Sequence, residues 1–396
     1  MTPIADRLLL RPRPVIFSDT TLREGDQMPG SRLDADGKVE IARLLEALGV
    51  QSIDAGFPAN SERERQAVRQ VAESVNGVVV SGLARAVRSD IDAVASALST
   101  TPRERSAVTV FIGTSPVHRT DKLGMSIDQI EATVRREIAY AASVVGTAAF
   151  SPEDATRTEP EVLVRLYRAA FEAGARVLGY TDTVGIATPE DVREVLEFLF
   201  AELPELEGAY FAVHFHDDLG LAVANTVAAA DMGADIVQVA LNGVGERAGN
   251  ASLEEVALAL HLHEHRYGRP VMLNLDRLYG ACHQSAHRTG PQIHAHKALL
   301  GANVYRTEAG VHQDGIMKNP QTYLPYDPAV VGGPGITLVL GPSSGRAAFA
   351  ARFASLGLGL NPEAESEVIR RMKEADRAEW DDPDALLRTK VAEVGV

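Results

Sequence analysis

The chain has 396 residues, of which 45% are hydrophobic and 23% charged, and its formal net charge is −15 at pH 7. A chain of this size and composition can form a substantial core and is neither disordered nor fibrous. The acidic balance argues against general affinity for nucleic acid or for anionic membranes.

The single cysteine, Cys282, excludes an intramolecular disulfide and cysteine-rich zinc modules, as is typical of a reducing compartment. No run reaches about 18 apolar residues, and the first residues lack the apolar core of a signal peptide. We therefore expect a cytoplasmic protein with no nucleic-acid or membrane partner.

Short apolar, β-rich runs alternate with helical segments along most of the chain. The runs lie near residues 15, 50, 78, 108, 147, 176, 210 and 235, and helices are expected at 36–48, 62–75, 90–98, 128–144, 161–173, 189–203, 219–232 and 253–263. Gly49, Gly174 and Gly233 follow three of these helices, as helix C-termini favour. Eight such units over roughly 250 residues predict an α/β fold, a (β/α)8 TIM barrel.

A doubly wound sheet is the competing fold. It would normally carry a glycine fingerprint for nucleotide phosphates after the first strand, and this sequence has neither G-x-G-x-x-G nor a P-loop there. We therefore favour the barrel, in which active-site residues gather at the C-terminal ends of the strands.

The alternation fades beyond residue 275, where glycine and proline accumulate. Two further helical stretches are expected at 362–373 and 383–393. The predicted domains are a barrel over 1–275 and a linker with small α-rich C-terminal subdomains over 276–396.

Two histidines stand two residues apart at the end of the apolar run before residue 217. In a strand, residues i and i+2 face the same side, so His214 and His216 can offer two imidazoles to one metal ion. Arg23, Glu24 and Asn250 follow other strand-like runs, the first and the eighth. The first, seventh and eighth strands are neighbours in a closed barrel, so these residues can converge into a carboxylate, imidazole and amide site for a divalent cation.

Each of these residues has a structural alternative. An isolated H-x-H pair is more often two core or surface histidines, and the flanking motifs are what favour a ligand role. Arg23 and Glu24 also suit an ion pair after a strand, and Asn250 after glycine suits a turn. A second H-x-H pair, His294 and His296, has no accompanying carboxylate motif, and we interpret it as non-ligating.

Three long stretches together are similar to one enzyme family. They are DTTLREGDQ at 19–27, HFHDDLGLAVAN at 214–225 and GVGERAGNASLEE at 243–255. Over nearly its whole length the chain resembles the 2-isopropylmalate and homocitrate synthases. The resemblance implies a metal-dependent TIM barrel with small C-terminal subdomains that condenses acetyl-CoA with a 2-oxo acid and hydrolyses the thioester to a 2-substituted malate and CoA.

Carried onto this sequence, the resemblance implies that Glu24, His214, His216 and Asn250 hold a divalent ion, which would be Mg2+, Mn2+, Zn2+ or Co2+. Such an ion orients a 2-oxo acid and polarises the carbonyl under attack. Arg23 would stabilise negative oxygen in the transition state.

The resemblance also assigns proton transfer at the acetyl methyl to His312 and Tyr323. In the family these residues come from the partner subunit, which implies a homodimer with active-site residues shared across subunits. The alternatives are a hydrogen-bonded loop histidine and an aromatic anchor against Pro325. No leucine-sensing regulatory domain of the kind found in many isopropylmalate synthases is expected.

Substrate contacts are expected from Arg23, Thr183, Asp54 and Ala149. The Thr183 hydroxyl would contact the substrate carboxylate, its alternative being a helix cap. Asp54 stands where the family commonly has Glu. Ala149 replaces both the Arg that homocitrate synthases use and the Glu typical of isopropylmalate synthases. The acceptor therefore stays open, and an atypical acid such as phosphonopyruvate is an alternative.

Two other classes of function are open. An acyl-CoA lyase similar to hydroxymethylglutaryl-CoA lyase shares the barrel and the metal arrangement but runs the reverse chemistry. A catalytically silent binding or scaffold protein would keep the barrel without turnover. The full set of expected site residues favours an acyltransferase of the synthase type over both.

Overall fold

The computed structural model describes residues 14–395 and divides into two compact units, one ending at Ile293 and one beginning at His294. The amino-terminal stretch, where the sequence shows no signal-peptide pattern, lies outside the described residues. Within residues 14–395, no helix is both long enough and apolar enough to cross a bilayer.

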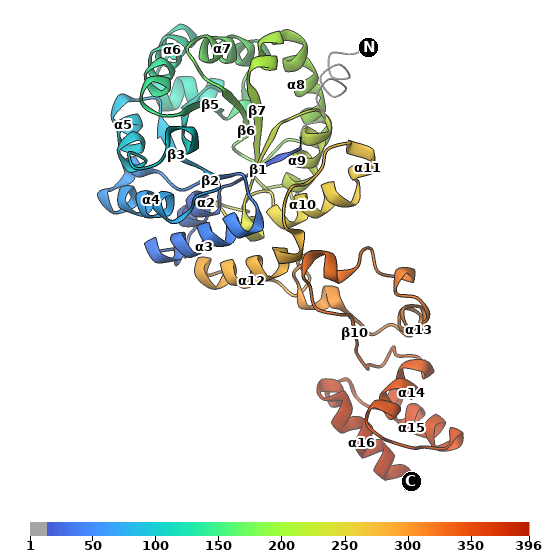
Figure 1. The fold of residues 1–396 in the computed structure, drawn as a ribbon. Coiled ribbons are helices and arrows are strands. Elements are labelled where there is room, and N and C mark those ends of the chain that lie inside the picture. The colour runs from blue at the N-terminus through green and yellow to red at the C-terminus, as the bar shows by residue number, and fades with distance from the viewer. Residues whose placement is uncertain (1–13, 396) are drawn as a thin grey trace. The chain divides into compact units, whose positions relative to one another are not determined.

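The first unit is a closed barrel of eight parallel strands, in which each strand pairs with the next and the last pairs with the first. This confirms the predicted TIM barrel. Figure 1 shows the strands enclosed by helices. The strands are β1 Ile16–Asp19, β2 Ser52–Asp54, β3 Val79–Arg85, β4 Ser106–Gly113, β5 Thr147–Glu153, β6 Val177–Asp182, β7 Tyr210–Phe215 and β8 Ile236–Val239.

The helices of this unit follow the predicted alternation. They are α2 Thr21–Gln27, α3 Ala35–Leu48, α4 Glu62–Ser74, α5 Arg88–Ala97, α6 Ile127–Val144, α7 Pro160–Glu172, α8 Pro189–Glu202, α9 Ala222–Asp231, α10 Leu253–Leu262, α11 Glu264–Tyr267 and α12 Leu278–Thr289. Several begin at side-chain caps, as at Ser126 and Thr188, where a reciprocal capping box satisfies the first free backbone N–H groups.

The structure differs from the prediction at two places next to the strand ends. Arg23 and Glu24 lie on the short helix α2 and not at the end of a strand. Helix α9 begins at Ala222 and not at residue 219, because the Asp217 carboxylate accepts the Ala222 N–H and Gly220 has a left-handed backbone that a helix does not allow.

Helix α12 belongs to the first unit, which therefore extends past the expected boundary at residue 275. The helix packs against α3 and buries Leu278 and Cys282. The Asn242 amide donates to the Cys282 carbonyl oxygen over 3.0 Å, which joins α12 to the loop after β8. The Cys282 thiol is buried at this position.

The second unit contains a two-stranded sheet and four helices. These are β9 Arg306–Thr307, α13 Gly310–Lys318, β10 Thr337–Leu338, α14 Arg346–Ser355, α15 Pro362–Glu374 and α16 Pro383–Val394. The last two confirm the helices predicted for this region. Phe349, Phe353, Val368 and Met372 form the centre of a separate apolar core, so the unit has its own packing.

A buried lysine joins three elements that surround the C-terminal ends of β1 and β2. Lys38 on α3 is 1% exposed, and its ammonium lies 2.7 Å from Glu64 Oε1 on α4 and 3.2 Å from Asp26 Oδ2 on α2. Glu64 Oε1 also accepts the backbone N–H of Phe57, in the loop after β2, over 3.2 Å. One buried ion pair thus holds both the helix that follows β1 and the loop that follows β2.

Breaking this pair from one side should be costly, because it leaves a buried charge without its main partner. We expect Glu64→Ala to lower the free energy of unfolding by about 3 kcal/mol or more, and the double change Lys38→Met/Glu64→Leu to recover most of that loss. Urea denaturation measures both. Glu172→Ala, which removes an exposed pair with Arg135, is the control and should cost less than about 1 kcal/mol. Equal losses for Glu64→Ala and the control would contradict the role of the pair.

Candidate metal centre

Two histidines at the end of β7 point into the barrel, as the strand periodicity predicts. His214 and His216 are both buried. Their Nε2 atoms are 3.2 Å apart, with the ring centroids separated by 4.9 Å. Two imidazole nitrogens at this separation face a common point, as ligands of one ion do.

Glu24 brings a carboxylate to the same point from α2. Its Oε1 atom lies 3.6 Å from His214 Nε2, and the ligand atoms of Glu24, His214 and His216 all lie within 4.8 Å of one another. Among residues 14–395 these three form the one group of three or more carboxylate, imidazole or thiol side chains that converge in this way. The predicted ligands that follow β1 and lie at the end of β7 are therefore brought together.

Asn250 is positioned by backbone pairing with His216, in an antiparallel bridge. Its amide nitrogen donates to the Val244 carbonyl over 2.9 Å, while its Oδ1 atom is buried and accepts no hydrogen bond. Gly245 permits this arrangement, because a Cβ there would lie 2.1 Å from the Asn250 amide nitrogen. A buried amide oxygen without a donor suits a divalent cation, so this residue fits the predicted set.

The protonation states also fit metal binding. Burial, together with the neighbouring His216, lowers the pKa of His214 to about 3, and burial likewise lowers the pKa of His216. Burial alone would raise the pKa of Glu24, but the surrounding groups, with the Arg23 guanidinium first and the two histidines after it, together outweigh burial and the pKa falls to about 2. At neutral pH the site therefore presents two neutral imidazoles and one carboxylate, the forms that bind metal ions.

The His216 ring is oriented from behind. Its Nδ1 atom lies 3.3 Å from the Gly249 carbonyl oxygen, which can only accept. Nδ1 therefore carries the proton and Nε2 keeps its lone pair for a ligand, the usual arrangement for metal-binding histidines.

Arg23 lies beside this group and is held by two carboxylates. Its Nε donates to Asp54 Oδ2 over 2.6 Å, and its NH1 group contacts Glu24 Oε1. Burial would lower the pKa of Arg23, but these two carboxylates raise it above its ordinary value, so the guanidinium stays charged. The shorter Asp54 side chain, found where Glu was expected, thus still reaches Arg23.

A cavity of about 440 Å3 opens at the C-terminal ends of the strands, over the three converging side chains. Seventeen residues line it, which are Arg23, Glu24, Gln27, Asp54, Phe57, Leu83, Thr109, Phe111, Ser151, Glu153, Thr181, Thr183, His214, His216, Gln238, Glu246 and Arg247. Three of the four predicted substrate contacts, Arg23, Asp54 and Thr183, are among them. On β5 the cavity wall is formed by Ser151 and Glu153, which lie two and four residues after the fourth, Ala149.

Some lining residues that were not predicted show a recognisable spacing in the sequence. Thr109 and Phe111 lie two residues apart on β4, as Ser151 and Glu153 do on β5. The same two-residue periodicity that identified the histidines would have placed these pairs on the inner face near the strand ends.

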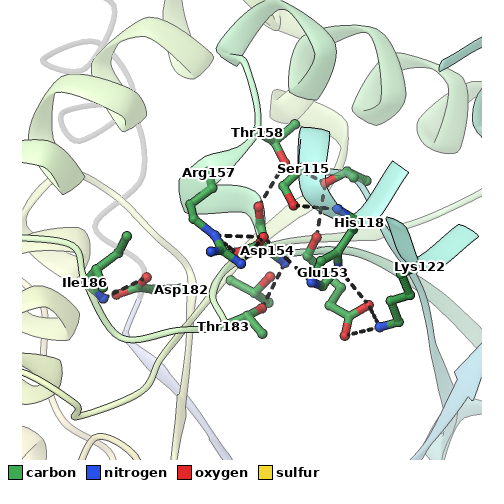
Figure 2. A network of polar contacts seen from close by, with 12 residues as sticks. Ser115, His118, Lys122, Glu153, Asp154, Arg157, Thr158, Asp182, Thr183 and Ile186 are labelled. Carbon is green, nitrogen blue, oxygen red and sulfur yellow. Dashed lines mark hydrogen bonds and ion pairs between the residues drawn. The ribbon is translucent and has the colours of Figure 1, made fainter. Parts of the chain in front are cut away.

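Thr183 is fixed by the neighbouring loop. Figure 2 shows its hydroxyl oxygen accepting the backbone N–H of Asp154, over 2.8 Å. Asp154 has a left-handed backbone and is held by Arg157, whose Nε lies 2.9 Å from both of its carboxylate oxygens. Thr188 is the residue that caps α8, so the helix-cap alternative for Thr183 is wrong. Because the contact with Asp154 uses the Thr183 hydroxyl oxygen as an acceptor, the hydroxyl proton can still be donated.

His312 and Tyr323 lie in the second unit, on α13 and directly after the short helix Pro320–Thr322. Their ring centroids are 4.1 Å apart with 31° between the planes, so the structure brings these two residues together. The other histidine pair, His294 and His296, is exposed, with ring centroids 5.6 Å apart.

Comparison with known proteins gives two family matches. A family model described as HMGL-like matches residues 14–282, and one described as homocitrate synthase post-HMGL domain-like matches residues 299–379. A 2-isopropylmalate synthase from Pyrococcus abyssi is 41% identical over 369 residues, which is 93% of this chain and 76% of that protein. Another from Staphylococcus saprophyticus is 40% identical, over 90% of this chain and 69% of that protein.

Solved structures show a related fold. A Bacillus subtilis HMG-CoA lyase matches with a TM-score of 0.59 at 22% identity, over 71% of this chain and 96% of the lyase. Hydroxymethylglutaryl-CoA lyase from Pseudomonas aeruginosa gives a TM-score of 0.60 at 20% identity, with 71% and 95% coverage. At this level of identity the likeness shows the fold alone.

Removing one of the converging side chains should abolish metal binding. We expect His214→Gln and Glu24→Gln to reduce the bound divalent metal from about one ion per chain to a small fraction of that value, because each change removes one of the four expected side-chain ligands. Elemental analysis after dialysis against Mn2+ or Zn2+ measures the content. His294→Gln is the matched control and should keep its metal; unchanged content in all three variants would contradict the site.

Proposed function

The chain belongs to the HMGL-like family together with 2-isopropylmalate synthases, and we propose that it is an acyltransferase that condenses acetyl-CoA with a 2-oxo acid. Hydrolysis of the thioester would then release a 2-substituted malate and CoA. The observation that carries the proposal is the group of Glu24, His214 and His216 beside the charged Arg23 in one cavity.

Glu24, the two histidines and Asn250 would hold the divalent ion, which supplies electrophilic polarisation of the acceptor's keto group when bound. Arg23 shares the cavity and is fixed by Asp54 on its Nε side. A guanidinium fixed in this way costs no reorganisation when negative charge develops on the acceptor oxygen, so its role would be to stabilise that charge.

Thr183 would bind the acceptor's carboxylate. Its oxygen is occupied as an acceptor by the Asp154 N–H, which leaves the hydroxyl proton as a donor. A carboxylate offers only acceptors, so the two groups are complementary.

His312 and Tyr323 would transfer the proton from the acetyl methyl group. Their ring contact supports a joint role, and both are exposed on the second unit. Val311, beside His312, is 74% exposed, and Tyr323 is 44% exposed. Apolar and aromatic surface of this kind suits a protein interface, and we propose that these residues act at the active site of a partner subunit in a homodimer.

The charges around the cavity favour an acceptor with an uncharged side chain. Its lining includes four carboxylates and two guanidinium groups, namely Glu24, Asp54, Glu153, Glu246, Arg23 and Arg247. The Lys122 ammonium, 2.7 Å from both oxygens of Glu153, neutralises one carboxylate. Asp218 likewise neutralises Arg247, so a bound dication leaves the site without excess charge. A substrate with one carboxylate then adds one negative charge, whereas a phosphonate-bearing acid would add further negative charge without a partner.

A thiol-release assay tests the function. Metal-loaded protein is incubated with acetyl-CoA and one acid at a time, from 2-oxoisovalerate, pyruvate, glyoxylate, oxaloacetate, 2-oxoglutarate and phosphonopyruvate. We expect CoA release that depends on the acid and is fastest with a monocarboxylate. Fastest release with phosphonopyruvate would overturn the charge argument, and cleavage of hydroxymethylglutaryl-CoA without any acid-dependent release would point to a lyase.

Shared active sites predict complementation between two inactive variants. Arg23→Ala and His312→Ala should each be inactive alone, because each lacks one part of every site. After mixing and subunit exchange, about a quarter of the wild-type activity should return, since half of a symmetric dimer population is mixed and each mixed dimer has one intact site. No recovery, in a mixture shown by mass spectrometry to contain mixed dimers, would place His312 and Arg23 of one site on the same chain.

A further inference from the structure

Arg247 is held at the cavity wall by three directed hydrogen bonds. Its Nε donates to Asp218 Oδ1 over 2.8 Å, and its NH2 group donates to Asp218 Oδ2 over 2.9 Å. The same NH2 group donates to the Thr183 backbone carbonyl over 2.8 Å. A two-pronged pair of guanidinium and carboxylate fixes orientation as well as distance.

These contacts join the three loops that follow neighbouring strands. Thr183 follows β6, Asp218 follows β7, and Arg247 lies between β8 and α10. The loops are pressed together, since a Cβ on Gly185 would lie 2.3 Å from Asp218 Oδ2. Arg247 also has a left-handed backbone, with a φ of 53°. That conformation is costly for a residue with a side chain and persists only where surrounding contacts hold it.

Each of the three loops joined by Arg247 carries a residue of the site. His216 stands two residues before Asp218, and Asn250 stands three residues after Arg247. The third residue, Thr183, accepts a hydrogen bond from Arg247 directly. The Asp217 backbone N–H donates to the Gly249 carbonyl over 3.0 Å, which connects the loops after β7 and β8 a second time. Release of the guanidinium would therefore disturb a metal ligand and a substrate contact together.

We infer that Arg247 is a positioning residue that locks the loops after β6, β7 and β8 into one rigid wall of the cavity. Its effect on metal affinity depends only on the converging ligands. Its effect on acceptor binding, through Thr183, rests on the proposed function. The two effects are therefore measured separately.

The test compares Arg247→Met with Arg193→Met. The control removes another arginine–aspartate pair of similar exposure, from Arg193 to Asp231 over 2.9 Å, with side-chain exposures of 40% and 26% against 42% and 24% for Arg247 and Asp218. Neither control residue lines the cavity. Equal changes in thermal stability are expected for the two variants.

Hydrogen exchange of the metal-free protein measures the local stability of the loops that form the cavity wall, and it needs no substrate. Peptides over 183–187 and 246–250 should exchange faster in Arg247→Met than in wild type and be unchanged in Arg193→Met. Mn2+ should bind about tenfold to a hundredfold more weakly to Arg247→Met, the range seen when supporting contacts of metal ligands are lost. Wild-type exchange and Mn2+ affinity in Arg247→Met would overturn the inference.

Two further variants separate positioning from general stability. Arg247→Lys keeps the charge but loses the two-pronged contact, so it should behave like Arg247→Met. The swapped pair Asp218→Arg/Arg247→Asp should restore part of the slow hydrogen exchange, whereas either change alone should not.

In the thiol-release assay, Arg247→Met should raise the KM for the preferred acid more than the KM for acetyl-CoA. If the wild-type protein shows no thiol release, the proposed function fails. The hydrogen-exchange and Mn2+-binding results still test whether Arg247 positions the three loops.

Discussion

The pairing of β1 with β8 is the interaction on which the site depends. It closes the sheet, with Ile16 opposite Ile236 and Asp19 opposite Val239. Closure places the end of β1, and the helix α2 that follows it, next to the ends of β7 and β8. An open parallel sheet would leave β1 and β8 at its two edges, with Glu24 far from the histidines of β7. The convergence of Glu24, His214 and His216 thus depends first on the closure of the barrel.

A layer of buried charge surrounds the converging ligands and gives them fixed positions. Arg23 is held between Asp54 and Glu24, and behind them Lys38 and Glu64 connect α2 with the loop after β2. Buried ion pairs contribute little net stability, because desolvation offsets most of their attraction. Here these ion pairs fix the orientation of the side chains, since each carboxylate has a fixed partner and the guanidinium stays directed at the cavity.

Periodicity and topology made most of the fold and the core of the site predictable from the sequence. The eight strands and the histidine pair follow from apolar runs and the two-residue repeat, and the convergence of Glu24 follows from barrel closure. Other features depend on three-dimensional context. Lys38 looks like a surface lysine on an amphipathic helix, and its burial depends on its contacts with Glu64 on α4 and Asp26 on α2. Arg247 reads as one residue of a matched motif, whereas its role in joining three loops depends on their close approach.

The long separation between the closing strands affects how the site comes into being. The Thr20 hydroxyl donates to the Val239 carbonyl across 219 positions of the chain. During synthesis at typical rates, β1 must therefore wait about 10 to 45 seconds before its final partner has been made. Until then the first strand has an open edge, which is where unwanted strand pairing begins. Glu24 and the two histidines meet only when that edge closes, so a metal ion can stabilise the finished barrel but cannot guide its early assembly.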